Sequence, residues 1–173
     1  IYSKGKLVAW QGRATLPEMK PRWYLPPGFV KVIYNADNVS PIEIPVVAEG
    51  IPSSIACGKN GVGVFGSALT QQQLDTISST WSTVLIATDP DTFVPDNRPG
   101  GRGIVKALEM KKQLDRLLKS PAKLIQWPVS LLELARKYNN GEDVRVPDPA
   151  DIGPLRMSKL IERSLHVAHH RAT

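Results

Sequence analysis

The residues best suited to chemistry are three acids that follow two apolar runs of the chain. Residues 44–48 lead directly into Glu49, and residues 83–88 lead into Asp89 and Asp91. Buried parallel strands read as continuous Val, Ile and Leu runs, and ligands of open α/β sheets bind just beyond their carboxyl ends. We therefore expect the three acids to meet at one edge of a sheet, although about forty residues separate Glu49 from Asp89.

Three neighbouring carboxylates repel one another unless a cation neutralises them, and Mg²⁺ prefers oxygen ligands. A simpler interpretation is that Asp89-Pro90-Asp91 is a polar turn and that Glu49 is a solvated strand end. The metal interpretation gains weight because both runs end in the same way, with glycines and expected helix starts close behind.

Composition indicates one globular domain, with room for a small appendage. The chain has 173 residues, of which 42% are hydrophobic, enough to bury a core. The single Cys57 excludes a disulfide framework and a zinc site of several cysteines, and it suits a reducing cytosol. Because no long apolar stretch or signal peptide is visible, we expect a soluble protein that does not enter a membrane. The first residue is Ile1 rather than Met, so we expect the chain to be part of a larger polypeptide.

Charge is unevenly distributed along the chain. The formal net charge is +6, with +4 in residues 1–41, −4 in residues 42–101 and +6 in residues 102–173. An acidic centre between basic flanks fits a metal site beside a surface that attracts polyanions such as nucleic acid. A solvated basic face without a partner is the alternative.

The order of apolar runs and turn residues predicts an α/β fold with a mostly parallel sheet flanked by helices, preceded by a small β-rich appendage. Residues 6–13 and 29–34 read as strands of this appendage, joined by a proline-rich connector over residues 16–28. Ser53 and Ser54 are expected to cap a short helix, and Thr70 with Gln73 forms a capping-box pattern. The expected strands of the main domain are 44–48, 62–66, 83–88 and 123–127, and its expected helices are 53–57, 71–79, 104–118, 131–138 and 154–169.

The order of these motifs resembles the Toprim domain shared by DNA primases and topoisomerases, and most closely that of bacterial and phage primases. Glu-Gly ends one strand, a helix of small residues and a short strand ending in glycine follow, and Asp-x-Asp ends the next long strand. The corresponding positions here are Glu49-Gly50, 53–57, Gly58, 62–66, the helix start at 69–74, and Asp89-Pro90-Asp91; outside this segment, residues 10–13, 22–28, 33–35 and 148–151 also resemble primase motifs.

The resemblance spans most of residues 5–153 and implies a division of the chain. Residues 1–41 would be a β-rich arm belonging to the amino-terminal subdomain of a primase-type polymerase, residues 42–153 the Toprim catalytic domain, and residues 154–173 a carboxyl-terminal helix. Two departures stand out. Ser53 occupies a position where primases usually carry Asp, and residues 92–99 intervene before the glycines that normally follow Asp-x-Asp.

The resemblance also implies Mg²⁺, for which Mn²⁺ can substitute, as the cofactor of nucleotidyl transfer. It implies Asp89 and Asp91 as metal ligands, and Glu49 as a ligand or general acid/base. Asp148 and Asp151 are candidates for outer members of this cluster. Their alternative role is to cap the amino terminus of the last helix.

Basic and aromatic residues could contact the template or an incoming nucleotide, since Arg binds phosphate bidentately and aromatic rings stack on bases. For each cation the alternative is a solvated surface charge, and for the aromatics it is a place in the core. The histidines near the carboxyl terminus suggest metal binding only faintly. The cations are Arg13, Lys20, Arg22, Arg98 and Arg102, the aromatics are Trp10, Trp23 and Tyr24, and the histidines are His166, His169 and His170.

From the resemblance we expect the catalytic Toprim segment of a phage- or plasmid-type DNA primase, which makes RNA primers on single-stranded DNA from nucleoside triphosphates. A replicative helicase is an expected partner, and the cytoplasm of a bacterium or of a phage-infected cell is the expected location. A zinc module of such a primase would lie outside this chain, which has one cysteine. Two alternatives remain: a Toprim-like module that binds single-stranded DNA or docks a helicase without catalysis, and a Toprim nuclease or topoisomerase-related enzyme.

Overall fold

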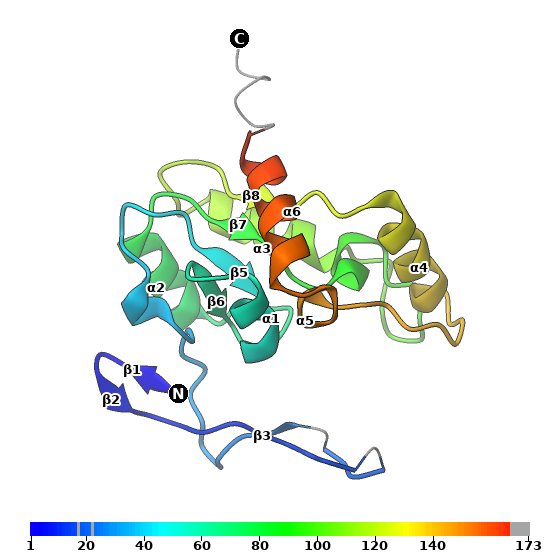
Figure 1. Cartoon of the computed structure of the whole chain (residues 1–173), viewed down its shortest axis with the longest axis horizontal. Helices are drawn as coiled ribbons and strands as arrows, with labels where there is room; N and C mark the ends of the chain where they lie inside the picture. Colours follow the sequence, from blue (N-terminus) through cyan, green and yellow to red (C-terminus); the bar gives the residue numbers. More distant parts are fainter. Residues whose placement is uncertain (17, 22, 167–173) are drawn as a thin grey trace.

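A four-stranded parallel sheet forms the centre of the molecule in this computed structural model, which describes residues 1–16, 18–21 and 23–166 (Figure 1). Its strands are β5 (Val46–Ala48), β6 (Gly61–Gly63), β7 (Leu85–Ile86) and β8 (Lys123–Leu124), in the spatial order β6-β5-β7-β8. Every pairing in this sheet is parallel. The predicted α/β fold is confirmed, with strands shorter than the apolar runs suggested.

Helices cover both faces of the sheet. Successive strand residues point to opposite sides, and because these residues are apolar, each face must be covered. Val47 packs into one core cluster with Ile77 and Leu114, whereas Val46 and Ala48 pack into a second cluster on the other face. The first cluster includes residues of α2 (Gln71–Thr80) and α3 (Lys106–Asp115); the second includes residues of α1 (Ile51–Ala56), α4 (Val129–Asn139), α5 (Pro149–Ile152) and α6 (Pro154–His166).

Local sequence signals explain where two of these helices begin. The predicted capping box of α2 is present: the Thr70 side chain accepts from the Gln73 amide, and the Gln73 side chain accepts from the Thr70 amide. The prediction that Ser53 and Ser54 cap α1 is wrong. The helix already begins at Ile51, after the N-cap Gly50, because the following Pro52 fits the first turn of a helix. As a result, both serines are buried within α1.

The amino-terminal arm consists of two small antiparallel strand pairs. β1 (Tyr2–Ser3) pairs with β2 (Lys6–Leu7), and β3 (Gly12–Arg13) pairs with β4 (Trp23–Tyr24). The predicted single strand over residues 6–13 is therefore divided between two pairs. The division falls at Ala9, whose carbonyl accepts a hydrogen bond from the terminal amine of Ile1.

The predicted strand over residues 29–34 is wrong. Only Tyr34 pairs with the sheet, through an isolated antiparallel bridge to Gly63 on the edge strand β6. Asn35 then adopts a left-handed conformation with φ of 65° and leads into the 3-10 helix η1 (Ala36–Asn38). Its side-chain amide donates to the Gly61 carbonyl at 2.9 Å, which holds this turn against the edge of β6.

The expected helix 154–169 is present as α6 over its described part, starting at Pro154, while His169 and His170 lie outside the described residues. Among the described helices, none has the length and apolar character needed to cross a membrane.

Candidate metal centre

The three acids are brought together by the pairing of β5 with β7. In their parallel register, Val47 lies opposite Ile86, so both strands run toward the same edge of the sheet. Glu49 directly follows β5, and Asp89 follows β7 after Ala87 and Thr88. Carboxylate oxygens of Glu49, Asp89 and Asp91 all lie within 4.8 Å of one another. The predicted convergence of these acids at the carboxyl edge of the sheet is confirmed.

A short 3-10 helix, η2 (Pro90–Phe93), holds the two aspartates in place. Thr92 donates to the Asp89 carbonyl from its amide at 3.0 Å and from its hydroxyl at 2.7 Å. The hydroxyls of Thr88 and Thr92, both buried, lie 2.8 Å apart. The backbone that carries Asp89 and Asp91 is therefore fixed by hydrogen bonds that leave the carboxylates free.

Helix α4 supports the same turn from a distant part of the chain. The side-chain amide of Asn139, which is fully buried, donates to the Asp91 carbonyl at 2.8 Å and to the Val94 carbonyl at 3.4 Å. In the sequence, Asn139 reads only as part of a polar turn before Gly141, so its role in positioning Asp91 had no local signal.

Burial and mutual repulsion raise the pKa values of the three acids and so favour their protonated forms. Burial, followed by the charge of Asp91, raises the pKa of Glu49 to about 7, and burial with the charge of Glu49 raises the pKa of Asp89 to about 8. Burial also raises the pKa of Asp91. One oxygen each of Glu49 and Asp89 is buried without a hydrogen-bond partner. Such a set of unpaired oxygens is what a hard divalent cation binds, and the cation would replace the bound protons.

Asp148 and Asp151 form a capping box at the start of α5. The Asp151 amide donates to the Asp148 carboxylate at 2.8 Å, and the Asp148 amide donates to Asp151 at 3.2 Å. Their capping interpretation is confirmed for α5, the short helix before α6. Asp148 still lies near the centre, since its charge raises the pKa of both Glu49 and Asp89.

Two of the candidate phosphate-binding cations lie in the loop between η2 and α3, and the others lie on the arm. Arg98 is engaged by the carboxylate of Asp96, and Arg102 is exposed in the same loop. On the arm, Arg13 lies over the ring of Trp23, 5.2 Å from its centroid, and Lys20 is exposed. Arg22 lies outside the described residues.

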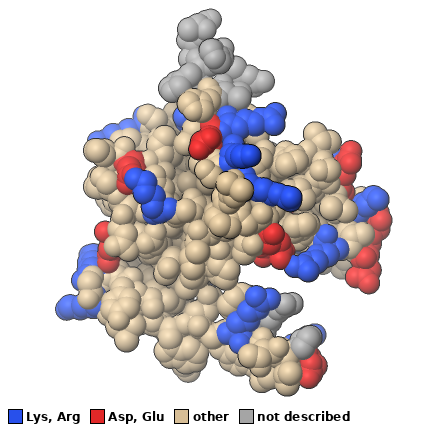
Figure 2. All heavy atoms as spheres, in the orientation of Figure 1, with Lys and Arg blue, Asp and Glu red and all other residues tan. Residues whose placement is uncertain are grey.

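The arm aromatics are not core residues. Trp10 is 58% exposed and Trp23 is 40% exposed, while Tyr24 is half-buried. Figure 2 shows a hollow between the arm and the body of the molecule, with Lys and Arg side chains on both of its sides and acidic side chains on the side of the body. This surface is open to a partner with stacking groups and negative charge.

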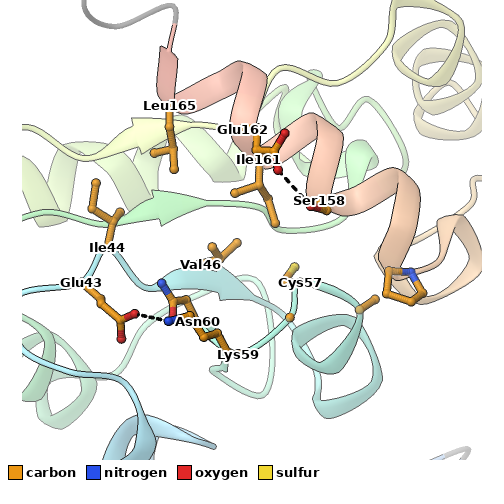
Figure 3. Close-up of a pocket in the computed structure, with 13 residues that line it drawn as sticks. Glu43, Ile44, Val46, Cys57, Lys59, Asn60, Ser158, Ile161, Glu162 and Leu165 are labelled. Carbon is orange, nitrogen blue, oxygen red and sulfur yellow. Dashed lines mark hydrogen bonds and ion pairs between the residues drawn. The ribbon is translucent and has the colours of Figure 1, made fainter.

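A cavity of about 530 Å³ lies elsewhere, between α6, α1 and the start of β5 (Figure 3). Its walls are largely apolar, with Val46, Cys57 and Ile161 among them and an ion pair between Glu43 and Lys59 at the rim. None of the three acids lines it, so the cavity is separate from the candidate metal centre.

Comparison with solved structures identifies the fold. The Aquifex aeolicus primase, solved with its zinc-binding and RNA polymerase domains, superimposes with a TM-score of 0.62 at 18% identity, over 94% of this chain and 37% of that one. A DNA primase domain from Pseudomonas aeruginosa gives 0.59 at 18% identity, over 92% of this chain and 48% of that one. The DnaG primase catalytic domain bound to single-stranded DNA gives 0.57 at 17% identity, over 94% and 48% respectively. The chain shares the α/β fold of these DNA primase domains.

The chain spans less than half the length of each of these three structures. No protein-family profile and no curated protein matches its sequence. The likeness is therefore one of fold, and the arrangement of its own residues must support any proposal about activity.

The departures from the primase pattern lie beside the acids in this Toprim fold. Ser53 is buried in α1, the helix that follows Glu49, and places no carboxylate there. The additional residues after Asp91 form η2 and a loop that returns to the start of α3. Lys106, the first residue of α3, lowers the pKa of Glu49 and Asp91 through its charge. Lys106 could not be linked to the acids from the sequence, because it lies beyond the unusual loop.

Proposed function

We propose that this chain is the metal-binding Toprim segment of a DNA primase of the phage or plasmid type, acting in Mg²⁺-dependent synthesis of RNA primers on single-stranded DNA. The observation that carries the proposal is the cluster of Glu49, Asp89 and Asp91 within 4.8 Å at the carboxyl edge of a primase-type sheet. The nucleoside triphosphates, a replicative helicase and a cytoplasmic location belong to the same proposal.

The acids fit Mg²⁺ by their chemistry, since all offered ligands are carboxylate oxygens and two of these oxygens are buried without partners. When bound there, the cation supplies neutralisation of triphosphate charge and activation of the attacking 3′ oxygen. Asp89 and Asp91 would hold it. Glu49 is either a third ligand or the group that accepts the proton of the 3′ hydroxyl.

Replacement of one ligand in the parent protein tests the proposal. Asp89→Asn should abolish primer synthesis while leaving the fold and DNA binding intact, because DNA binding depends on Lys and Arg. Asp143→Asn, which removes an exposed carboxylate in the loop after α4, is the matched control and should synthesise primers at the wild-type rate. Unchanged primer synthesis by the Asp89→Asn variant would refute the enzyme proposal.

A non-catalytic module that binds single-stranded DNA is the second candidate. It is favoured by Ser53, which leaves one acidic position of the primase pattern unfilled, and by the long loop after Asp91. If the wild-type parent protein made no primers, and if the wild type and the Asp89→Asn variant bound DNA equally, this second function would replace the first.

A further inference from the structure

The loop between η2 and α3 folds around one buried acid, Asp96. The Asp96 amide donates to the Ile104 carbonyl at 3.2 Å, and the Gly103 amide donates to the Asp96 carbonyl at 2.9 Å. A Cβ atom at Gly101 would lie 2.3 Å from the backbone carbonyl oxygen of Asp96 and 2.6 Å from the side-chain Cγ of Asp96. The loop is therefore closed tightly on Asp96, which is only 6% exposed.

Two cations contact the Asp96 carboxylate, and they are held very differently. Arg98 binds both oxygens, with Nε and Nη2 each at 2.8 Å, and its guanidinium lies 4.4 Å from the ring centroid of Tyr138. Lys106 approaches only one oxygen, with Nζ at 3.6 Å, which is beyond hydrogen-bond length. The ammonium of Lys106 therefore retains donors for another partner, whereas the guanidinium of Arg98 is largely satisfied.

Lys106 also lies beside the metal centre. It is the first residue of α3, and this helix packs against η2, which carries Asp91. The charge of Lys106 lowers the pKa of Glu49 and of Asp91, so its field reaches the acids as well as Asp96. The side chain is 40% exposed and can turn toward a molecule bound at the acids.

We infer that Lys106 binds a phosphate group of the nucleoside triphosphate held at the metal centre, with Asp96 keeping the ammonium in place when no nucleotide is bound. This inference rests on the proposed function. A triphosphate bound with a metal at Asp89 and Asp91 would carry excess negative charge, and a lysine ammonium is a mobile point charge suited to it. Of the two loop arginines expected from the sequence to bind phosphate, Arg98 is already paired with both oxygens of Asp96, which favours Lys106 in this role.

Titration of the chain with ATP in the presence of Mg²⁺, by calorimetry, tests the inference. Lys106→Gln should weaken ATP binding about tenfold, the effect of one charge-assisted hydrogen bond. Lys106→Arg should restore most of the affinity. Lys111→Gln, which makes the same charge change on the same helix at a residue paired with Asp115, should bind ATP like the wild type. Mn²⁺ binding without nucleotide should not weaken in the Lys106→Gln variant, because a neighbouring positive charge is removed.

Three results would overturn the inference while leaving the proposed function standing. The first is equal ATP affinity of the Lys106→Gln and Lys111→Gln variants. The second is a loss of Mn²⁺ affinity without nucleotide in the Lys106→Gln variant that matches its loss of ATP affinity. The third is a Lys106→Gln variant that binds ATP normally but binds a single-stranded oligonucleotide, titrated separately, more weakly than the wild type. If the wild type bound neither Mn²⁺ nor ATP, the proposed function would fail and the inference with it.

Discussion

The side-chain amide of Asn139 donates a hydrogen bond of 2.8 Å to the backbone carbonyl of Asp91, which lies 48 residues earlier in the chain. This contact joins the end of α4 to the 3-10 helix that contains Asp91 and begins after its N-cap residue Asp89. The backbone carbonyl of Asn139 also accepts a hydrogen bond from the backbone amide of Asn97 at 3.0 Å. One buried residue thus holds both the Asp91 turn and the loop that follows it.

Replacing Asn139 should disturb the metal centre, although Asn139 is not one of the three candidate ligands. Asn139→Ala removes a buried amide and leaves the Asp91 carbonyl unpaired, which should lower the free energy of unfolding by about 1–3 kcal/mol. Because Asp91 would lose its support, Mn²⁺ affinity should fall as well, as measured by titration well below the melting temperature. Asn140→Ala is the control, since Asn140 is exposed and its side chain accepts a hydrogen bond from the side chain of Asn97 rather than donating one to the Asp91 turn. Equal Mn²⁺ affinity in both variants would show that Asn139 acts on stability alone.

The stability of the metal-free protein should depend on pH in a defined direction. Folding raises the pKa of Asp89 from 3.8 to about 8 and that of Glu49 from 4.5 to about 7. The folded state thus binds more protons than the unfolded state between these values, so stability falls as pH rises from about 4 to about 8. Melting temperatures measured across this range in EDTA should decline, and saturating Mg²⁺ should reduce the decline.

The Asp89→Asn variant provides the control for this pH dependence. It removes one of the coupled acids, so its melting temperature without metal should change less between pH 4 and 8 than that of the wild type. At the upper end of the range it should melt at or above the wild-type temperature, because a repulsive charge is gone. An identical pH dependence of the melting temperature in both proteins would mean that folding does not raise the pKa of Asp89.

Binding of single-stranded DNA should be independent of sequence and should weaken steeply with salt, because it rests on contacts of Lys and Arg with phosphates. Arg13→Gln should lower the affinity and reduce the slope of log affinity against log salt by about 1. Lys119→Gln, an equal charge change in the exposed turn between α3 and β8, should leave the slope unchanged. A salt-independent affinity, measured by fluorescence anisotropy of a labelled oligonucleotide, would show that the basic flanks are merely solvated.

The acids could be predicted because each follows an apolar run whose meaning is local. Once the runs before Glu49 and Asp89 are recognised as neighbouring parallel strands, their ends must share an edge. The capping boxes of Thr70 and Asp148 were equally local. Such signals depend on only a few adjacent residues, so they can be recognised from the sequence alone.

Long-range contacts could not be predicted in this way. The apolar residues 29–34 look like a strand, but Ile33 is buried in the core and Tyr34 forms a single bridge before Asn35 turns the chain. Asn139 and Lys106 reach the metal centre only through the packing of α4 and α3 on η2. Their residue types carry no period or motif, so only the folded structure relates them to the acids.

The most direct test of the metal centre is a crystal of this chain grown or soaked with Mn²⁺ and measured at a wavelength where manganese scatters anomalously. We expect an anomalous peak among Glu49, Asp89 and Asp91, with oxygens of at least two of these residues at about 2.0–2.3 Å from the manganese. The Asp89→Asn variant, treated in the same way, should show a weaker peak or none. A well-ordered wild-type site with no anomalous peak among the three acids, or with manganese bound only elsewhere, would contradict the central claim.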